Sequence, residues 1–182
     1  MCFTFLKSQG YEIGASLCED EFLNTASKLL QSSDGKKIIL PVDFGVSNDI
    51  LSSSRVDKPL ELIESTDIGV DIGSKSVALF NEIIHTSNTI FWNGPMGVFE
   101  NKSFEYGTRE ITKSVSQSNA YTVVGGGDSV SARNKYSEIQ NFNHISTGGG
   151  ASMELMEGKK LPGVNICLLY TSPSPRDNNR SR

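Results

Sequence analysis

The sequence predicts an α/β fold built on a parallel β-sheet with helices on both faces. Short apolar runs typical of buried strands alternate along the chain with stretches whose apolar residues recur at helical spacing. Three of the strand-like runs end in glycine-rich loops, at residues 94–97, 125–127 and 148–150. Repeated strand–loop–helix units form parallel sheets, and such sheets bind ligands at the carboxyl ends of their strands. We therefore expect the three loops to meet at one ligand site.

The N-terminal half contains one predicted helix, one predicted strand and one irregular segment. Four apolar residues share a helix face: Phe22, Ala26, Leu29 and Leu30. The Asp34–Gly35 pair is expected to end this helix. Residues 38–42 (IILPV) are a β-branched run typical of a strand buried on both faces, and Pro41 marks its end. The polar stretch 47–66 has no clear period and is expected to be a loop.

Strands and helices alternate more regularly in the C-terminal half. The predicted strands cover residues 89–92, 121–124 and 144–146. The predicted helices cover residues 74–87, a segment with Phe104, Ile111 and Val115 on one face, a short segment beginning near Ser129, and residues 151–157. Each glycine-rich loop lies between one of these strands and the helix that follows.

Composition excludes several classes of protein. A chain of 182 residues fits one domain of ordinary size, and a formal net charge of −4 argues against a nucleic-acid partner. Three isolated cysteines without CxxC spacing support neither disulfides nor a zinc site, so we expect reduced thiols. No apolar run reaches the ~20 residues of a membrane span, and the N-terminus lacks the pattern of a signal peptide. The expectation is a cytoplasmic protein that does not bind membranes.

The loop GGGDS (residues 125–129) suits phosphate binding. Glycines let the backbone approach a ligand closely, and a helix N-terminus offers unpaired amides with a favourable dipole. Asp128 could hold Mg²⁺ that bridges phosphates. Alternatively, Asp128 or Ser129 is only the N-cap of the following helix.

The other two loops allow a similar pair of interpretations. In TGGGAS (residues 147–152), unobstructed amides could stabilise a phosphoryl group during transfer, or the segment could be a turn capped by Thr147 or Ser152. In WNGPMGVFE (residues 92–100), a buried Asn93 could bind phosphate and Glu100 could accept from ribose hydroxyls. Glu100 could instead be a first-turn helix acid.

The chain lacks the two best-known nucleotide motifs. It contains no G-x-x-x-x-G-K-[ST], and its glycines do not follow the G-x-G-x-x-G spacing of dinucleotide folds. A dehydrogenase-type domain is therefore disfavoured, and a nucleotide would be held in another way.

Taken together, the three loop sequences resemble hallmark stretches of the phosphoglycerate kinase family, in the family's order. Several shorter segments fit the same resemblance: residues 3–7 with 12–14, 40–43, 71–73 and 157–164. The resemblance covers residues 1 to about 166. It implies an incomplete C-terminal lobe of a two-lobe kinase, with a Rossmann-like fold. The family transfers a phosphoryl group between ATP and 3-phosphoglycerate in glycolysis, and its C-terminal lobe binds Mg²⁺ with ATP or ADP.

The resemblance also implies roles for particular residues. Gly148, Gly149 and Gly150 would supply amides to the phosphoryl group in transfer, and Asp128 would bind Mg²⁺. The remaining positions would line the nucleotide pocket: Gly69 on the adenine side, Asn93, Pro95, Val98, Glu100 at the ribose, Gly126, Gly127 and Ser129.

Residues 1–166 are expected to form this partial lobe. Residues 167–182 are rich in Ser, Pro, Asn and Arg, and are expected to be a disordered, non-native tail. The family's phosphoglycerate-binding lobe is not represented, so a truncated gene model and negligible activity of the chain alone are expected. The resemblance implies a monomer. The alternative is a catalytically silent nucleotide-binding or interaction module on the same lobe.

Overall fold

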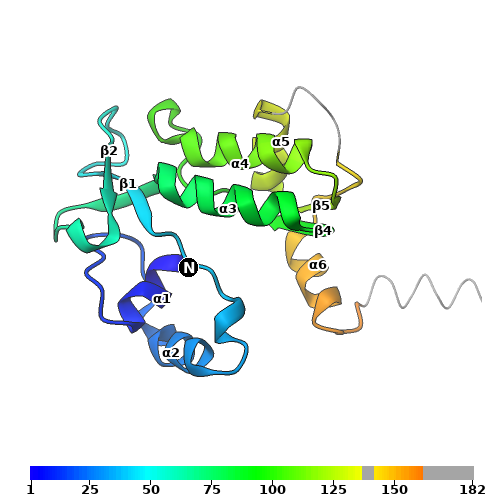
Figure 1. Ribbon diagram of the computed structural model, residues 1–182, viewed down its shortest axis with the longest axis horizontal. Helices are drawn as coiled ribbons and strands as arrows, with labels where there is room; N and C mark the ends of the chain where they lie inside the picture. The colour runs from blue at the N-terminus through cyan, green and yellow to red at the C-terminus, as the bar shows by residue number, and fades with distance from the viewer. Residues whose placement is uncertain (137–141, 162–182) are drawn as a thin grey trace, which may run out of the picture.

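The computed structural model describes residues 1–136 and 142–161 and shows two small sheets joined by helices (Figure 1). The helices are α1 (Cys2–Ser8), α2 (Leu23–Gln31), α3 (Ser74–Thr86), α4 (Tyr106–Gln117), α5 (Gly127–Tyr136) and α6 (Gly149–Met156). The strands are β1 (Asp43–Ser47), β2 (Val56–Pro59), β3 (Ile68–Ile72), β4 (Thr89–Asn93), β5 (Tyr121–Gly125) and β6 (His144–Ser146). Four 3₁₀ turns are η1 (Asp20–Phe22), η2 (Gly35–Lys37), η3 (Leu60–Leu62) and η4 (Lys102–Phe104). The predicted tail 167–182 lies outside the described residues.

The parallel part of the fold is confirmed. Strands β4, β5 and β6 form a parallel sheet in that order, with Trp92 opposite Val124 and Gly125 opposite Ser146. Helices α3, α4 and α5 lie on one side of this sheet and α6 lies on the other (Figure 1). The chain is thus a mixed α/β protein whose three-stranded parallel sheet is flanked by helices.

The first half of the chain contradicts two predictions. Residues 38–42 form no strand; the strand begins at Asp43, and Ile39 and Val42 are about half exposed. The predicted loop 47–66 contains β2 and η3. These segments build an antiparallel sheet in the order β2–β1–β3. Pro41 cannot donate to a sheet ladder, which fits the absence of a strand at residues 38–42. Strand β2 is polar, so no apolar period marks it.

Asp43 shows why β1 begins where it does. Its carboxylate accepts hydrogen bonds from the Lys75 amide at 2.9 Å and the Ser76 amide at 2.7 Å. The Ser76 hydroxyl in turn bonds to the Asp43 carboxylate at 2.6 Å. Because this one carboxylate accepts hydrogen bonds from two amides of the first helical turn, it joins β1 to the N-terminus of α3.

Helix boundaries in the C-terminal half follow the predictions to within a few residues, but two features of the N-terminal half differ. Helix α1 is absent from the predictions because residues 2–8 are short and lack a full helical period. On α2, only Ala26 of the four predicted face residues is fully buried. Phe22 and Leu29 are about half exposed and line a shallow cavity beside α1.

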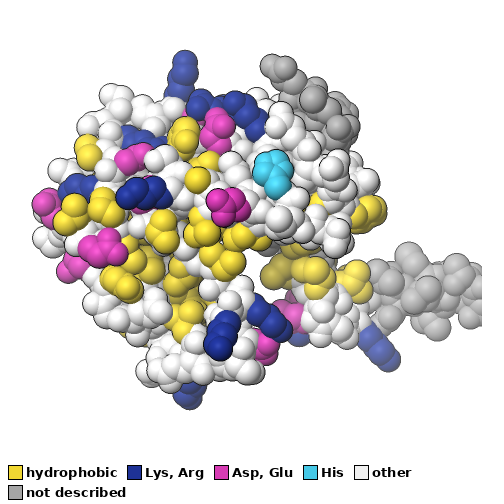
Figure 2. Space-filling view, in the orientation of Figure 1, with side chains coloured by type: hydrophobic (Ala, Val, Ile, Leu, Met, Phe, Trp, Pro, Cys, Tyr) yellow, Lys and Arg dark blue, Asp and Glu magenta, His cyan; other side chains and the backbone are white. Residues whose placement is uncertain are grey.

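Three apolar clusters hold the elements together. One joins α1 to β1 through Phe3 and Phe44, whose ring centroids lie 4.8 Å apart. The second joins α3 to α4, and the third packs α5 on the parallel sheet around Trp92 and Val124. Apolar side chains also gather in the hollow between α3 and the α1–α2 pair (Figure 2).

The described residues include two of the three cysteines and all the helices that can be compared with the expected absence of a membrane span. Cys2 and Cys18 are free thiols, and Cys167 lies outside the described residues. Burial raises the pKa of the Cys2 thiol, which keeps it protonated. Among the residues that the structure describes, no helix is both long and apolar enough to span a bilayer.

Candidate functional site

The three glycine-rich loops converge at the carboxyl edge of the parallel sheet. Each loop follows the last residue of one strand: Asn93 of β4, Gly125 of β5 and Ser146 of β6. The Gly126 amide donates to the Ser146 carbonyl at 3.0 Å, and the Gly94 amide donates to the Ser129 hydroxyl at 2.6 Å. The predicted meeting of three loops at one edge is therefore confirmed.

Asn93 lies at the centre of this convergence. Its side chain is exposed, contrary to the expectation of a buried asparagine, because β4 ends where the sheet opens to solvent. A β-carbon added at Gly149 would lie 2.7 Å from Asn93 Oδ1 and 2.8 Å from Gly126 Cα. A β-carbon added at Gly126, where φ is +88°, would lie 3.0 Å from the same oxygen. Only glycine fits the closest contact, so Gly149 and Gly126 bring two helix N-termini beside Asn93.

Both helix N-termini present backbone amides toward the convergence of the loops. Gly148 is the N-cap of α6, and within the described residues no side chain caps this terminus. Ser152 lies inside the helix and donates to the Gly148 carbonyl, so neither it nor Thr147 is the cap. The first amides of a helix have no intrahelical partner and can bind an anion. The same holds for α5, which begins at Gly127.

Asp128 and Ser129 have different surroundings although they are adjacent. Both lie inside the first turn of α5, so neither is its N-cap. Ser129 is 1% exposed, and its hydroxyl accepts from Gly94, so Ser129 ties the β4 loop to α5. Asp128 is exposed, and no hydrogen bond or ion pair involving its carboxylate is found in the described part of the chain.

The Asp128 carboxylate fits Mg²⁺ delivered with a nucleotide better than a resident metal. Within residues 1–136 and 142–161, no group of three or more His, Cys, Asp or Glu side chains could hold a cation. Mg²⁺ is commonly bound by one or two carboxylates together with substrate phosphates and water. A single unpaired carboxylate beside two helix N-termini matches this donor set.

The loop at residues 94–100 is held from several sides. Trp92 donates from Nε1 to the Gly94 carbonyl at 2.7 Å, and the Val98 amide donates to the Val70 carbonyl at 2.8 Å. Pro95 and Val98 are partly buried. Glu100 is exposed in the turn before η4, so it is not a helix acid. The side chain is thus free to meet a ligand.

The Asn101 side chain has a structural role that the sequence pattern did not reveal. Its amide donates to the carbonyls of Ile50 at 3.2 Å and Ser52 at 2.8 Å. Its Oδ1 accepts the Ser103 amide at 3.0 Å. Asn101 therefore ties the end of the 94–100 loop to the β1–β2 connection. A polar residue after a glycine loop was the only available signal.

Gly69 is separated from the glycine convergence by position in the fold. It lies in β3 of the antiparallel sheet, where its amide donates to Ser16 Oγ at 2.8 Å. A β-carbon at Gly69 would contact the Phe3 ring. The carbonyl of its neighbour Val70 accepts from the Val98 amide, so Gly69 lies one residue from the contact between β3 and the 94–100 loop.

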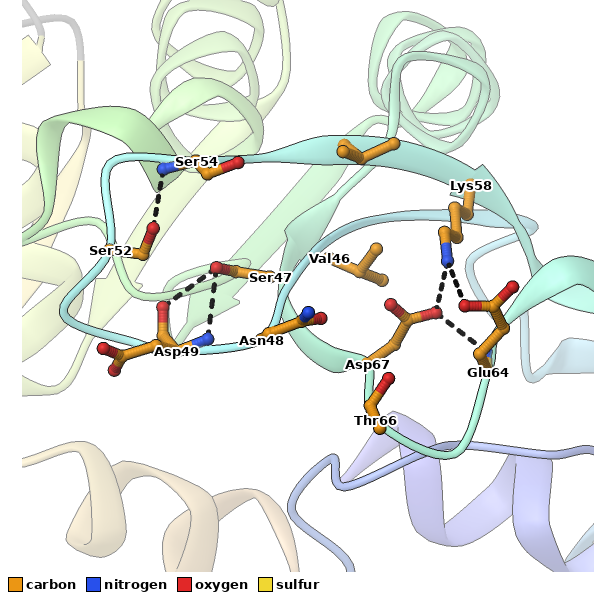
Figure 3. A pocket seen from close by; sticks show the side chains of 11 residues that line it. Val46, Ser47, Asn48, Asp49, Ser52, Ser54, Lys58, Glu64, Thr66 and Asp67 are labelled. Atoms are coloured by element: carbon orange, nitrogen blue, oxygen red, sulfur yellow. Dashed lines mark hydrogen bonds and ion pairs between the residues drawn. The ribbon is translucent and has the colours of Figure 1, made fainter.

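A polar cavity of about 410 Å³ lies beside the antiparallel sheet, in a segment predicted to be only a loop (Figure 3). Lys58 Nζ bonds to Asp67 Oδ2 at 2.8 Å and to Glu64 Oε2 at 3.3 Å. Burial alone would raise the pKa of Asp67, but the bonds from Lys58 and the Glu64 amide outweigh it and hold the pKa below its ordinary value. Asp67 in turn raises the pKa of Lys58. This cluster fixes the turn before β3.

The fold and the site define a class of protein: an α/β domain with glycine-rich loops, of a kind that can bind anions, at the carboxyl ends of three parallel strands. The family model of phosphoglycerate kinase matches residues 1–159. The chain belongs to the phosphoglycerate kinase family.

Individual relatives agree with this assignment. The chain is 49% identical to a phosphoglycerate kinase of Salinispora tropica over 166 residues, which are 90% of the chain and 41% of that protein. It is 48% identical to a phosphoglycerate kinase of Finegoldia magna, covering 91% of the chain and 42% of that protein. The solved structure of phosphoglycerate kinase from Coxiella burnetii matches with a TM-score of 0.83 and 39% identity, over 91% of the chain and 44% of the solved one. The chain thus spans about two fifths of the length of the curated relatives it matches.

Proposed function

We propose that this chain is the greater part of the C-terminal, nucleotide-binding lobe of a phosphoglycerate kinase. In this proposal the lobe binds ADP or ATP with Mg²⁺ for the reaction ATP + 3-phosphoglycerate ⇌ ADP + 1,3-bisphosphoglycerate. The observation that carries it is the convergence of the three glycine loops around Asn93, together with the family membership.

The residues divide the work as follows. Amides of Gly126, Gly127 and the first turn of α5 bind the nucleotide phosphates, and Asp128 binds the Mg²⁺ that arrives with them. Amides of Gly148, Gly149 and Gly150 face the phosphoryl group in transfer. Asn93, Pro95, Val98 and Glu100 bind the nucleoside, and Gly69 shapes the adenine side. Ser129 acts by holding the loop. Phosphoryl transfer depends mainly on such positioning and charge neutralisation.

The chain alone binds nucleotide but has negligible turnover, because the lobe that binds the second substrate, 3-phosphoglycerate, is not represented in it. Isothermal titration with MgADP tests the binding, and a coupled assay with 3-phosphoglycerate tests turnover. Absence of saturable MgADP binding to the folded chain would refute the proposal. Turnover near that of a full-length enzyme would refute the claim of inactivity. Saturable MgADP binding with no turnover even when the missing lobe is supplied would instead favour the catalytically silent module.

A further inference from the structure

Asp71 is a buried acid that the predicted nucleotide site does not use. Its side chain has no exposed surface. Asp71 Oδ2 accepts from Arg55 Nη1 at 2.6 Å and from the Gly107 amide at 2.7 Å. Oδ1 has no hydrogen-bond partner within the described residues. Burial raises the pKa of this carboxyl, and the Gly107 amide and Arg55 counteract the increase. A buried carboxylate with one unsatisfied oxygen is costly, so its position requires an explanation.

The Asp71 side chain lies directly against the 94–100 loop. A β-carbon added at Gly97 would lie 2.6 Å from Asp71 Cα and 2.9 Å from Oδ1. The neighbouring Val98 amide donates to Val70, so the loop crosses β3 in close contact at Asp71. Gly107, on the other side, belongs to the first turn of α4. Asp71 therefore lies between the loop, which packs against its Cα and Oδ1, and α4, whose Gly107 amide donates to Oδ2.

Arg55 reaches this carboxylate from the β1–β2 connection. Its Nη2 donates to the Ile72 carbonyl at 3.0 Å, and its Nε donates to Asp57 Oδ1 at 2.9 Å. The side chain is 13% exposed and crosses Gly45, where an added β-carbon would lie 2.5 Å from Nε and 2.7 Å from Cζ. A planar guanidinium can bind three acceptors at once, whereas an ammonium cannot match this geometry.

We propose that Arg55 and Asp71 are positioning residues that hold the 94–100 loop in its ligand-binding conformation. The pair touches no ligand; it acts through the contacts of Asp71 with Gly97 and Gly107. What the loop binds rests on the proposed function, but the positioning itself does not.

Two variants of the full 182-residue chain perturb the pair in different ways. Arg55→Met removes both the positive charge and the planar guanidinium that binds three acceptors. Gly45→Ala keeps both charges but places a methyl group where the guanidinium lies. Asp57→Asn is the matched control, because it weakens only the contact of Arg55 with a carboxylate that is 44% exposed. Arg55→Lys tests whether a positive charge without the planar guanidinium restores the conformation of the loop.

Amide hydrogen exchange, measured without ligand, is the first readout. We expect exchange at residues 94–101 to quicken by about tenfold or more in Arg55→Met and Gly45→Ala, with wild-type rates in α5 and α6. Asp57→Asn should match the wild type and Arg55→Lys should restore the rates only in part. Emission of Trp92, the single tryptophan, reports the same loop through its bond to Gly94. A merely structural role would instead quicken exchange uniformly, and that result would overturn the proposal.

Affinity for MgADP is the second readout. If the loop is in its binding conformation about a tenth of the time, the apparent Kd rises about tenfold. Folded variants with unchanged loop exchange and unchanged Kd would also overturn the proposal. If wild-type chain fails to bind MgADP, the proposed function fails, while loop exchange still decides the role of Arg55 and Asp71.

Discussion

Adding one methyl group at Gly149 tests the geometry of the candidate site most directly. The new β-carbon in Gly149→Ala would lie 2.7 Å from Asn93 Oδ1, 2.8 Å from Gly126 Cα and 2.9 Å from Gly126 N. These distances are about 0.6 Å inside ordinary van der Waals contact. The Asn93 side chain can rotate away, but Gly126 is backbone, so α6 must move. Overpacking of this kind costs roughly 1–3 kcal/mol.

Gly150→Ala is the control, because nothing lies within 4 Å of its added β-carbon. Both variants keep every backbone amide. We expect Gly149→Ala to lower the melting temperature by a few degrees. We also expect it to weaken MgATP binding by roughly tenfold, because the α6 amides that face the terminal phosphoryl group lose their alignment. Gly150→Ala should be as stable as the wild type or slightly more so. Circular dichroism melts and isothermal titration measure both effects. If the two variants behave alike, the close approach of α6 to Gly126 is not what organises the site.

Three further predictions concern single side chains. Asp128→Asn should leave the melting temperature unchanged, because the side chain is exposed, but should abolish the Mg²⁺ dependence of ADP affinity in titrations with and without the metal. Asp67 has a lowered pKa, so its contribution to stability is present above about pH 4 and is lost as pH falls through the folded-state pKa. Urea melts from pH 6 to pH 2 should therefore show a shallower acid decline in Asp67→Asn, and an unchanged slope would contradict the role of Lys58 as its partner. Trp92→Phe removes the bond to the Gly94 carbonyl and should cost about 1 kcal/mol in urea unfolding, with weaker MgADP binding.

The parallel sheet was predictable because its signals are local. Each of β4, β5 and β6 is a short apolar run followed at once by glycines and then by a helix, and the rule for parallel sheets places such loops at one edge. The resemblance carried by these loops also predicted the family correctly.

The antiparallel sheet was not predictable in the same way. Residues 38–42 are more apolar than residues 43–47, yet the strand is Asp43–Ser47. Its start depends on Asp43 accepting amides of α3, more than 30 residues away. Similarly, β2 is polar and none of its residues is buried, so no periodicity marks it. Pairing partners distant in sequence decide such strands, and local patterns carry little information about them.

The sequence by itself determined the fold class, the family and the identity of the three loops, because glycine runs after apolar strands depend on neighbours only a few residues away. The different roles of the residues within those loops, in contrast, depend on tertiary packing. Ser129 is buried as the acceptor of the Gly94 amide, whereas Asp128 beside it is exposed. Asn93 is open to solvent with Gly126 and Gly149 packed beside it. Arg55 meets Asp71 across 16 residues of chain. The physical reason is that burial and hydrogen bonding depend on what packs against a residue, and packing is set by the whole chain.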